Sequence, residues 1–93
     1  MKQPLVSVIC LCYNHQLYVQ EAIESVLNQT WSHIELIVVD DASTDTSREV
    51  IRALQKEHHL QKVLLLEKNM GNCAAFNRGL AIATGDFIID LAS

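Results

Sequence analysis

The chain has few residues that interrupt regular structure, with one proline and three glycines among 93 residues. None of the glycines lies in the loop after the first apolar run, which reads Cys12-Tyr13-Asn14-His15. Without glycine there, the backbone cannot approach a pyrophosphate as it does in a dinucleotide-binding loop, and the glycine-rich phosphate loop of nucleotide hydrolases is missing too. No loop suggests a Ser/His/Asp nucleophile. The sequence therefore excludes three common kinds of catalytic or cofactor-binding loop.

Basic clusters and long apolar runs are also missing. Seven Lys and Arg stand against eleven Asp and Glu, which gives a formal net charge of −4. Because there is no basic run or stripe, we expect no binding of nucleic acid through its phosphates. No apolar run approaches the ~20 residues that a membrane span requires. With 49% hydrophobic and 19% charged residues, the composition is that of a folded globular chain.

The three cysteines are Cys10, Cys12 and Cys73. Cys10 and Cys12 lie two apart on an expected strand, so they should point to the same face. An odd count in such positions indicates reduced thiols in a cytosolic chain. Zinc binding has little support, because the spacing of Cys10 and Cys12 is not Cys-x2-Cys and the other Cys and His residues are scattered.

Apolar runs alternate with amphipathic stretches along the whole chain. We expect strands over residues 5–11, 34–41, 62–66 and 86–91, and helices over residues 17–29, 46–59 and 73–83. The order β-α-β-α-β-α-β predicts an α/β fold, Rossmann-like, with three α/β/α layers and a mainly parallel sheet. The first strand is nearly all apolar, which favours a central position in that sheet.

Four local patterns add detail to this fold. Thr46 and Glu49 have the spacing of a capping box. Gly79, inside the third helix, marks close packing, and Gly85 follows that helix as a C-terminal capping glycine. We expect Trp31 to pack against a helix end or the sheet.

Residues suited to ligand contacts follow the first three strands, beyond the carboxyl ends where ligands bind in open parallel sheets, and Asp90 lies within the fourth strand. They supply hydrogen-bond acceptors and one aromatic ring, which suit the N–H and hydroxyl groups of a base and a sugar. For Asp41 a second interpretation is open, in which its carboxylate caps the next turn. The set comprises Tyr13, Asn14, Asp40, Asp41, Asn69, Gly71 and Asp90.

Several separate motifs, in order and at matching spacing, resemble the family 2 glycosyltransferases of the GT-A fold. They are residues 4–9, Tyr13-Asn14, residues 22–30, residues 35–45, residues 69–79 and residues 83–88. The resemblance implies that residues 1–93 are a single partial domain, the donor nucleotide-binding half of a truncated GT-A domain without its acceptor half. The longer enzyme would transfer a sugar from a nucleoside diphosphate sugar, a UDP-sugar, to an acceptor hydroxyl with inversion. Its acceptor would be a saccharide, a lipid-linked molecule or another hydroxyl compound.

The resemblance also implies roles for individual residues. Tyr13 and Asp41 would contact the base and ribose of the donor, and Asp40 and Asn14 would support the same edge of the sheet. Asn69 and Gly71 would border the diphosphate and sugar. The chain departs from the family where Leu11 replaces proline, where Cys12 replaces Thr or Ser in the pocket wall, and where Phe76 replaces an arginine of many members.

Catalytic residues and the metal site are expected outside this chain. The resemblance implies Mn²⁺ or Mg²⁺ in the longer enzyme, bound by an acidic motif just after Ser93. Asp90 falls earlier than that motif, so the metal ligands stay unassigned and the chain should not hold the ion firmly. We expect residues 1–93 to be inactive alone.

Two other functions fit parts of the pattern. The acid pair and the later Asp90 resemble a phospho-accepting receiver domain, although a whole strand and helix precede the pair. A non-catalytic α/β interaction module is the other alternative. We expect a cytoplasmic protein, with attachment to the inner face of the membrane open for the longer enzyme. Self-association through an exposed last strand is a further expectation.

Overall fold

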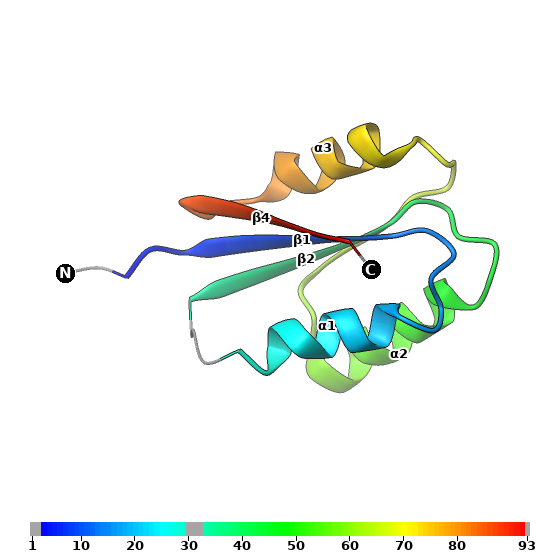
Figure 1. The fold of residues 1–93 in the computed structure, drawn as a ribbon, viewed down its shortest axis with the longest axis horizontal. Coiled ribbons are helices and arrows are strands. Elements are labelled where there is room, and N and C mark those ends of the chain that lie inside the picture. The colour runs from blue at the N-terminus through cyan, green and yellow to red at the C-terminus, as the bar shows by residue number, and fades with distance from the viewer. Residues whose placement is uncertain (1–2, 30–32, 93) are drawn as a thin grey trace.

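The computed structural model describes residues 3–29 and 33–92, so the expectation for Trp31 lies outside the described residues. One sheet of four parallel strands carries the fold, in the order β3-β2-β1-β4 (Figure 1). The predicted alternation and the central position of β1 are confirmed. The elements are β1 (Val6–Cys12), α1 (Val19–Leu27), β2 (Ile34–Asp40), α2 (Ser47–His58), β3 (Lys62–Leu65), α3 (Asn72–Ile82) and β4 (Phe87–Ala92).

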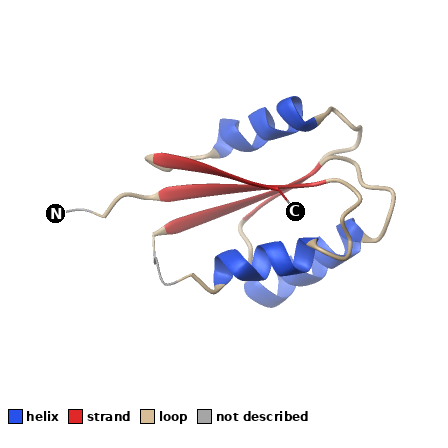
Figure 2. Cartoon of the chain, in the orientation of Figure 1, coloured by secondary structure: helices blue, strands red, loops and turns tan. Residues whose placement is uncertain are grey.

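The helices cover both faces of the sheet, which gives three layers (Figure 2). On one face, α1 and α2 pack over Cys10, Cys12 and Val38. On the other face, α3 packs over Ile9, Ile37 and Val39. Each core is built from alternate residues of the same strands, as the two-residue period of a strand requires. Among the described residues, no helix is long and apolar enough to cross a membrane.

The start of α2 differs from the predicted capping box. Thr46 is the N-cap residue, but its side chain makes no capping hydrogen bond. Its hydroxyl donates instead to Oε1 of Gln16 (2.8 Å), and the Ser47 N–H donates to Oδ1 of Asp45 (2.8 Å). The capping-box prediction is wrong because the Thr46 N–H, which would donate to the Glu49 side chain in a capping box, donates to Oε1 of Gln16 in the loop after β1 (2.9 Å).

A polar network lies at the amino edge of the sheet, beneath the end of α3. The Glu35 carboxylate accepts hydrogen bonds from Lys62 Nζ (2.6 Å) and from the Thr84 N–H (2.9 Å) and hydroxyl (2.7 Å), and from the Ser7 hydroxyl (2.8 Å). Lys62 Nζ also donates to the carbonyl of Ile82, in the last turn of α3 (2.9 Å). Burial raises the pKa of Glu35, but these hydrogen bonds outweigh it and lower the pKa to about 2. The network ties the C-terminal end of α3 to the sheet.

Gly79 lets α3 lie directly on the sheet, as predicted. A Cβ at this position would stand 2.9 Å from Cγ2 of Ile9 and 3.1 Å from Cγ2 of Val39. Gly79→Ala gains up to about 1 kcal/mol of helix propensity, whereas overpacking a core costs about 1–3 kcal/mol. We therefore expect a net loss of about 1 kcal/mol, measured as a lower urea midpoint with an unchanged slope. The control is Ala81→Gly, at an exposed position of the same helix, which should lose only the propensity difference. A Gly79→Ala variant more stable than the wild type would contradict the close approach.

Candidate functional site

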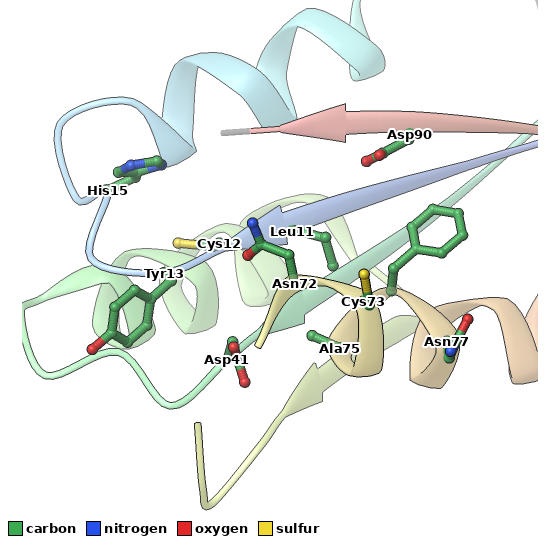
Figure 3. Close-up of a pocket in the computed structure, with 11 residues that line it drawn as sticks. Leu11, Cys12, Tyr13, His15, Asp41, Asn72, Cys73, Ala75, Asn77 and Asp90 are labelled. Carbon is green, nitrogen blue, oxygen red and sulfur yellow. The ribbon is translucent and has the colours of Figure 1, made fainter. Parts of the chain in front are cut away.

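A pocket of about 550 Å³ opens at the carboxyl edge of the sheet, between β1, β4 and the first turns of α3 (Figure 3). Parallel strands place their loops at this edge, and the crossover after β3 brings the N-terminus of α3 to it. The lining is mostly apolar, with two carboxylates, two amides and no Lys or Arg. The lining residues are Leu11, Cys12, Tyr13, His15, Asp41, Asn72, Cys73, Ala75, Phe76, Asn77 and Asp90.

Asp41 connects the end of β2 to the start of α3. Its carboxylate accepts the Met70 N–H at Oδ1 (2.7 Å) and the Gly71 N–H at Oδ2 (3.0 Å), and its carbonyl accepts Nδ2 of Asn69 (3.3 Å). Gly71 is the N-cap of α3 and has φ 87°, a conformation that glycine adopts without strain. Asp41 is only 3% exposed. The turn-capping interpretation of Asp41 is wrong, because the turn that follows is capped by Asp40, which accepts the Ser43 N–H (3.0 Å). Asp41 instead holds the start of α3, and its carboxylate keeps further lone pairs for a ligand.

Tyr13 and His15 lie in the loop after β1 and line the pocket from that side. The Tyr13 side chain is 42% exposed, so a face of its ring is free to be covered by a ligand. The His15 ring meets the ring of Tyr18 edge-on, with centroids 6.3 Å apart. An aromatic ring and an imidazole therefore stand at the mouth of a cavity whose floor carries Asp41.

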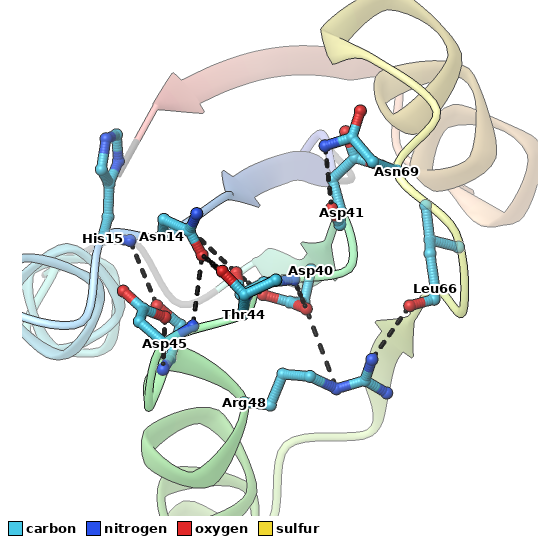
Figure 4. A network of polar contacts seen from close by, with 11 residues as sticks. Asn14, His15, Asp40, Asp41, Thr44, Asp45, Arg48, Leu66 and Asn69 are labelled. Atoms are coloured by element: carbon cyan, nitrogen blue, oxygen red, sulfur yellow. Dashed lines mark hydrogen bonds and ion pairs between the residues drawn. The ribbon is translucent and has the colours of Figure 1, made fainter.

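Asp40 and Asn14 hold two loops together and do not line the pocket (Figure 4). Asp40 is fully buried and accepts the N–H of Ser43 (3.0 Å) and the Ser43 hydroxyl. Oδ1 of Asn14 accepts the Thr44 N–H (2.8 Å), and the Asn14 N–H donates to the Ser43 hydroxyl (2.9 Å). Asn14 has φ 52°, which asparagine tolerates in tight turns. These contacts fix the loop after β1 against the loop after β2.

Arg48 supports the same arrangement from α2. Its Nε lies 3.9 Å from Oδ2 of Asp40, and its Nη1 donates to the carbonyl of Leu66 (3.0 Å). Arg48 is therefore engaged with the protein itself. It connects the end of β2 to the chain leaving β3.

The structure thus divides the residues predicted for the site into two groups. Cys12, Tyr13, Asp41 and Asp90 line the pocket together. Asn14 and Asp40 lie behind it, and Asn69 and Gly71 reach it only through Asp41.

The family resemblance placed the helix from Gly71 beside the donor, but sequence reasoning missed the side chains of α3 that form the pocket wall. Asn72, Cys73, Phe76 and Asn77 all lie in its first two turns and line the pocket. Their spacing of one, four and five residues is that of one helix face, and a crossover helix begins at the carboxyl edge. Both signals were present in the sequence.

The cysteine thiols of the pocket region are not paired with one another. All three cysteines are free, with Cys10 and Cys12 buried and Cys73 exposed. Burial, with Cys12 and the Asp90 carboxylate nearby, raises the pKa of the Cys10 thiol to about 12. Cys10 is therefore a neutral core residue and not a nucleophile.

Residues 7–91 match the sequence profile of glycosyl transferase family 2. The chain belongs to this family. An uncharacterized glycosyltransferase of Nostoc sp. is 46% identical over 83 residues, which are 89% of this chain and 26% of that protein. The chain therefore spans about a quarter of the length of this relative.

Solved structures of glycosyltransferases share the fold. A mannosyltransferase from Pyrobaculum calidifontis, in complex with GDP-Man and Mn²⁺, has a TM-score of 0.82 and 28% identity over 94% of this chain and 26% of its own. Glucosyl-3-phosphoglycerate synthase from Mycobacterium tuberculosis, in complex with Mn²⁺, UDP and glucosyl-3-phosphoglycerate, has a TM-score of 0.76 and 26% identity over 97% of this chain and 33% of its own. The predicted GT-A fold is confirmed, and the receiver-domain alternative is not favoured.

The described residues of this family 2 chain do not make a site for the Mn²⁺ that those two structures contain. Such an ion needs several oxygen ligands. Over residues 3–29 and 33–92, no three His, Cys, Asp or Glu side chains come together as a metal site. Asp41 and Asp90 both line the pocket, but the Asp41 carboxylate already accepts two backbone N–H groups.

Proposed function

We propose that this chain binds the nucleoside part of a nucleoside diphosphate sugar, as the donor half of a family 2 glycosyltransferase. The observation that carries the proposal is the pocket in which Tyr13, Asp41 and the first turns of α3 meet at the carboxyl edge of the sheet. The Tyr13 ring packs on the base, and the free lone pairs of Asp41 accept an N–H of the base or a hydroxyl of the ribose. Cys12 forms the wall beside them.

Charge favours the nucleoside over the diphosphate as the occupant of this pocket. The N-terminus of a helix attracts anions, but at α3 the Asp41 carboxylate already occupies that position. Asp90 adds a second carboxylate, and no Lys or Arg lines the pocket. A phosphate here would meet two negative charges, whereas the donor groups of a base and a ribose would meet acceptors. Asn69 and Gly71, outside the lining, border the diphosphate and sugar.

For the longer protein we propose sugar transfer from a UDP-sugar to an acceptor hydroxyl, with inversion. In such a displacement a general base takes the proton of the acceptor hydroxyl while the nucleoside diphosphate leaves. We assign neither that base nor a divalent ion to residues 1–93, and we propose that this chain binds the nucleotide without turnover. Release of UDP from a UDP-sugar by residues 1–93 would contradict this assignment. We also propose a cytoplasmic location, which the three free thiols support.

Tyr13→Ala tests the nucleoside contact. Base–aromatic stacking is worth about 1–3 kcal/mol per base, so we expect the Kd for UDP, measured by calorimetry, to rise about tenfold. The fold should be unaffected because the ring is substantially exposed. The matched control is Phe87→Ala, an exposed aromatic residue at the amino end of β4, which should leave the Kd unchanged.

Three parallel titrations decide between the candidate functions. UDP and GDP are compared because they differ in the base that Tyr13 and Asp41 are proposed to contact. We expect UDP to bind more tightly than GDP. Acetyl phosphate should leave the protein unmodified; stable phosphorylation would support a receiver domain instead. No binding of either nucleotide by the folded wild type would favour an interaction module.

A further inference from the structure

His15 is fixed to the protein through its backbone, while its ring lines the pocket (Figure 3). Its N–H donates to the hydroxyl of Ser47 (3.1 Å), and its carbonyl accepts the N–H groups of Tyr18 (2.9 Å) and Val19 (2.8 Å). Ser47 is fully buried and begins α2, and Val19 begins α1. The backbone of His15 is therefore held by two helices, which keeps the ring in a defined place at the pocket mouth.

The residues on either side of His15 are anchored in the same way. The Asn14 N–H donates to the hydroxyl of Ser43 (2.9 Å), and the Gln16 N–H donates to Oδ2 of Asp45 (3.2 Å). Three successive N–H groups of the loop after β1 thus donate to side chains that follow β2. A loop fixed in this way needs no ordering when a ligand binds, so binding costs less conformational entropy.

The nitrogen atoms of the His15 ring are available to a ligand. The ring meets Tyr18 edge-on, but within the part of the chain that the structure describes neither ring nitrogen makes a hydrogen bond or an ion pair. The carboxylate of Asp45, in the neighbouring loop, accepts backbone N–H groups instead. An imidazole carries at least one N–H donor, and two when it is protonated.

The phosphates of the proposed ligand need a donor of this kind. A nucleoside diphosphate sugar is negatively charged, whereas the pocket lining includes Asp41 and Asp90 and no Lys or Arg. Lys68 and Arg78 line a different pocket, between the chain after β3 and α3. Among the residues that line the nucleoside pocket, His15 is therefore the one basic side chain.

We propose that the His15 ring donates a hydrogen bond to a phosphate oxygen of the bound nucleotide. The inference rests on the proposed function, because it takes the nucleoside to lie between Tyr13 and Asp41. The phosphates then continue along the pocket mouth, where His15 stands, and Asn69 and Gly71 border them from the side of α3. His15 thus distinguishes a nucleotide from a nucleoside, whereas Tyr13 and Asp41 contact both alike.

Parallel titrations with uridine and UDP, followed by nuclear magnetic resonance, test this contact. His15→Phe keeps an aromatic ring beside Tyr18 and the same backbone contacts, but it removes both ring nitrogens. Because hydrogen bonds to charged groups are the stronger ones, we expect the Kd for UDP to rise about tenfold and the Kd for uridine to stay unchanged. The matched control is His58→Phe in the last turn of α2, outside the pocket, which should leave both values unchanged. Both variants should keep the wild-type urea midpoint.

The histidine resonances of the wild type give a second measurement. The chain has four histidines, and His33, His58 and His59 do not line the pocket, so they serve as internal references. UDP should shift the ring signals of His15 and leave the other three in place. Uridine should shift the His15 signals much less. No shift at His15, or equal shifts with the two ligands, would overturn the phosphate contact.

A third variant separates failure of this contact from failure of the proposed function. Tyr13→Ala should weaken the binding of uridine and UDP by the same factor. If it weakens neither, the nucleoside proposal fails, and the placement of His15 that rests on it fails too. If it weakens both while His15→Phe binds UDP like the wild type, or loses uridine and UDP equally, the His15 contact alone is overturned.

Discussion

Asp41→Ala is expected to lower the free energy of unfolding by about 3 kcal/mol and to abolish measurable UDP binding. The Asp41 carboxylate accepts two N–H groups at the start of α3, at 2.7 and 3.0 Å, and both contacts are partly buried. Hydrogen bonds to a charged group contribute about 1.5–3 kcal/mol each. Favourable interaction with the helix dipole adds a few tenths more. Urea unfolding measures the first effect, and calorimetry of the folded variant measures the second.

Two matched variants separate the roles of Asp41. Asp41→Asn keeps one acceptor oxygen but loses the charge. It should therefore lose about half as much stability as Asp41→Ala does, and it should bind UDP measurably but less tightly than the wild type. Asp90→Asn removes a carboxylate from the same pocket at an exposed position on β4, and it should leave stability nearly unchanged. Wild-type stability of Asp41→Ala would contradict the capping role. Wild-type UDP affinity in the folded variant would contradict the nucleoside contact.

The two contacts make Asp41 the link between the fold and the proposed ligand. α3 supplies Asn72, Cys73 and Phe76 to the pocket wall, and its start is held by Asp41. A change at Asp41 therefore removes one ligand contact and also releases the helix that carries several others. We accordingly expect a larger loss of binding at Asp41 than at Tyr13.

The order of elements was predictable because it depends on local periodicity, whereas the different roles of Asp40 and Asp41 were expected only from the family resemblance and not from the residues themselves. The two residues are chemically identical and adjacent in sequence. Asp40 ends β2 and is buried against Ser43 and Arg48, while Asp41 begins the loop and meets the N–H groups of Met70 and Gly71. The partners of Asp41 lie 29 and 30 residues away in the sequence, so local periodicity does not encode its contacts.

Gly85 shows a second limit of sequence patterns. It was predicted to cap α3 in the left-handed conformation, but the C-cap is Ala83 in an extended conformation, and Gly71 is the chain's positive-φ glycine among the described residues. The prediction is wrong for a tertiary reason. A Cβ on Gly85 would lie 2.7 Å from the Ser7 nitrogen and 2.9 Å from the Leu5 carbonyl oxygen, so glycine serves a close approach to β1. A lone glycine after a helix is compatible with either use.

Lys62→Met is expected to lower the free energy of unfolding by about 2 kcal/mol at pH 7. The substitution leaves Glu35 ionised without its ammonium partner, at a side chain that is 14% exposed. Removing one member of a fully buried pair costs about 3–5 kcal/mol, and the partial exposure of Lys62 (28%) and the remaining Ser7 and Thr84 donors reduce that figure. The variant also frees the Ile82 carbonyl at the end of α3. Urea unfolding measures the loss.

The pH dependence and a double variant identify the cause of that loss. Because the folded-state pKa of Glu35 is lowered from 4.5 to about 2, its contribution is present above pH 4.5 and is lost as pH falls toward 2. The stability difference between the wild type and Lys62→Met should therefore shrink below pH 4.5. Glu35→Gln combined with Lys62→Met should recover part of the loss at pH 7, since no unpaired charge remains. A difference that stays constant from pH 7 to pH 3 would show that Lys62 acts through the Ile82 carbonyl and not through Glu35.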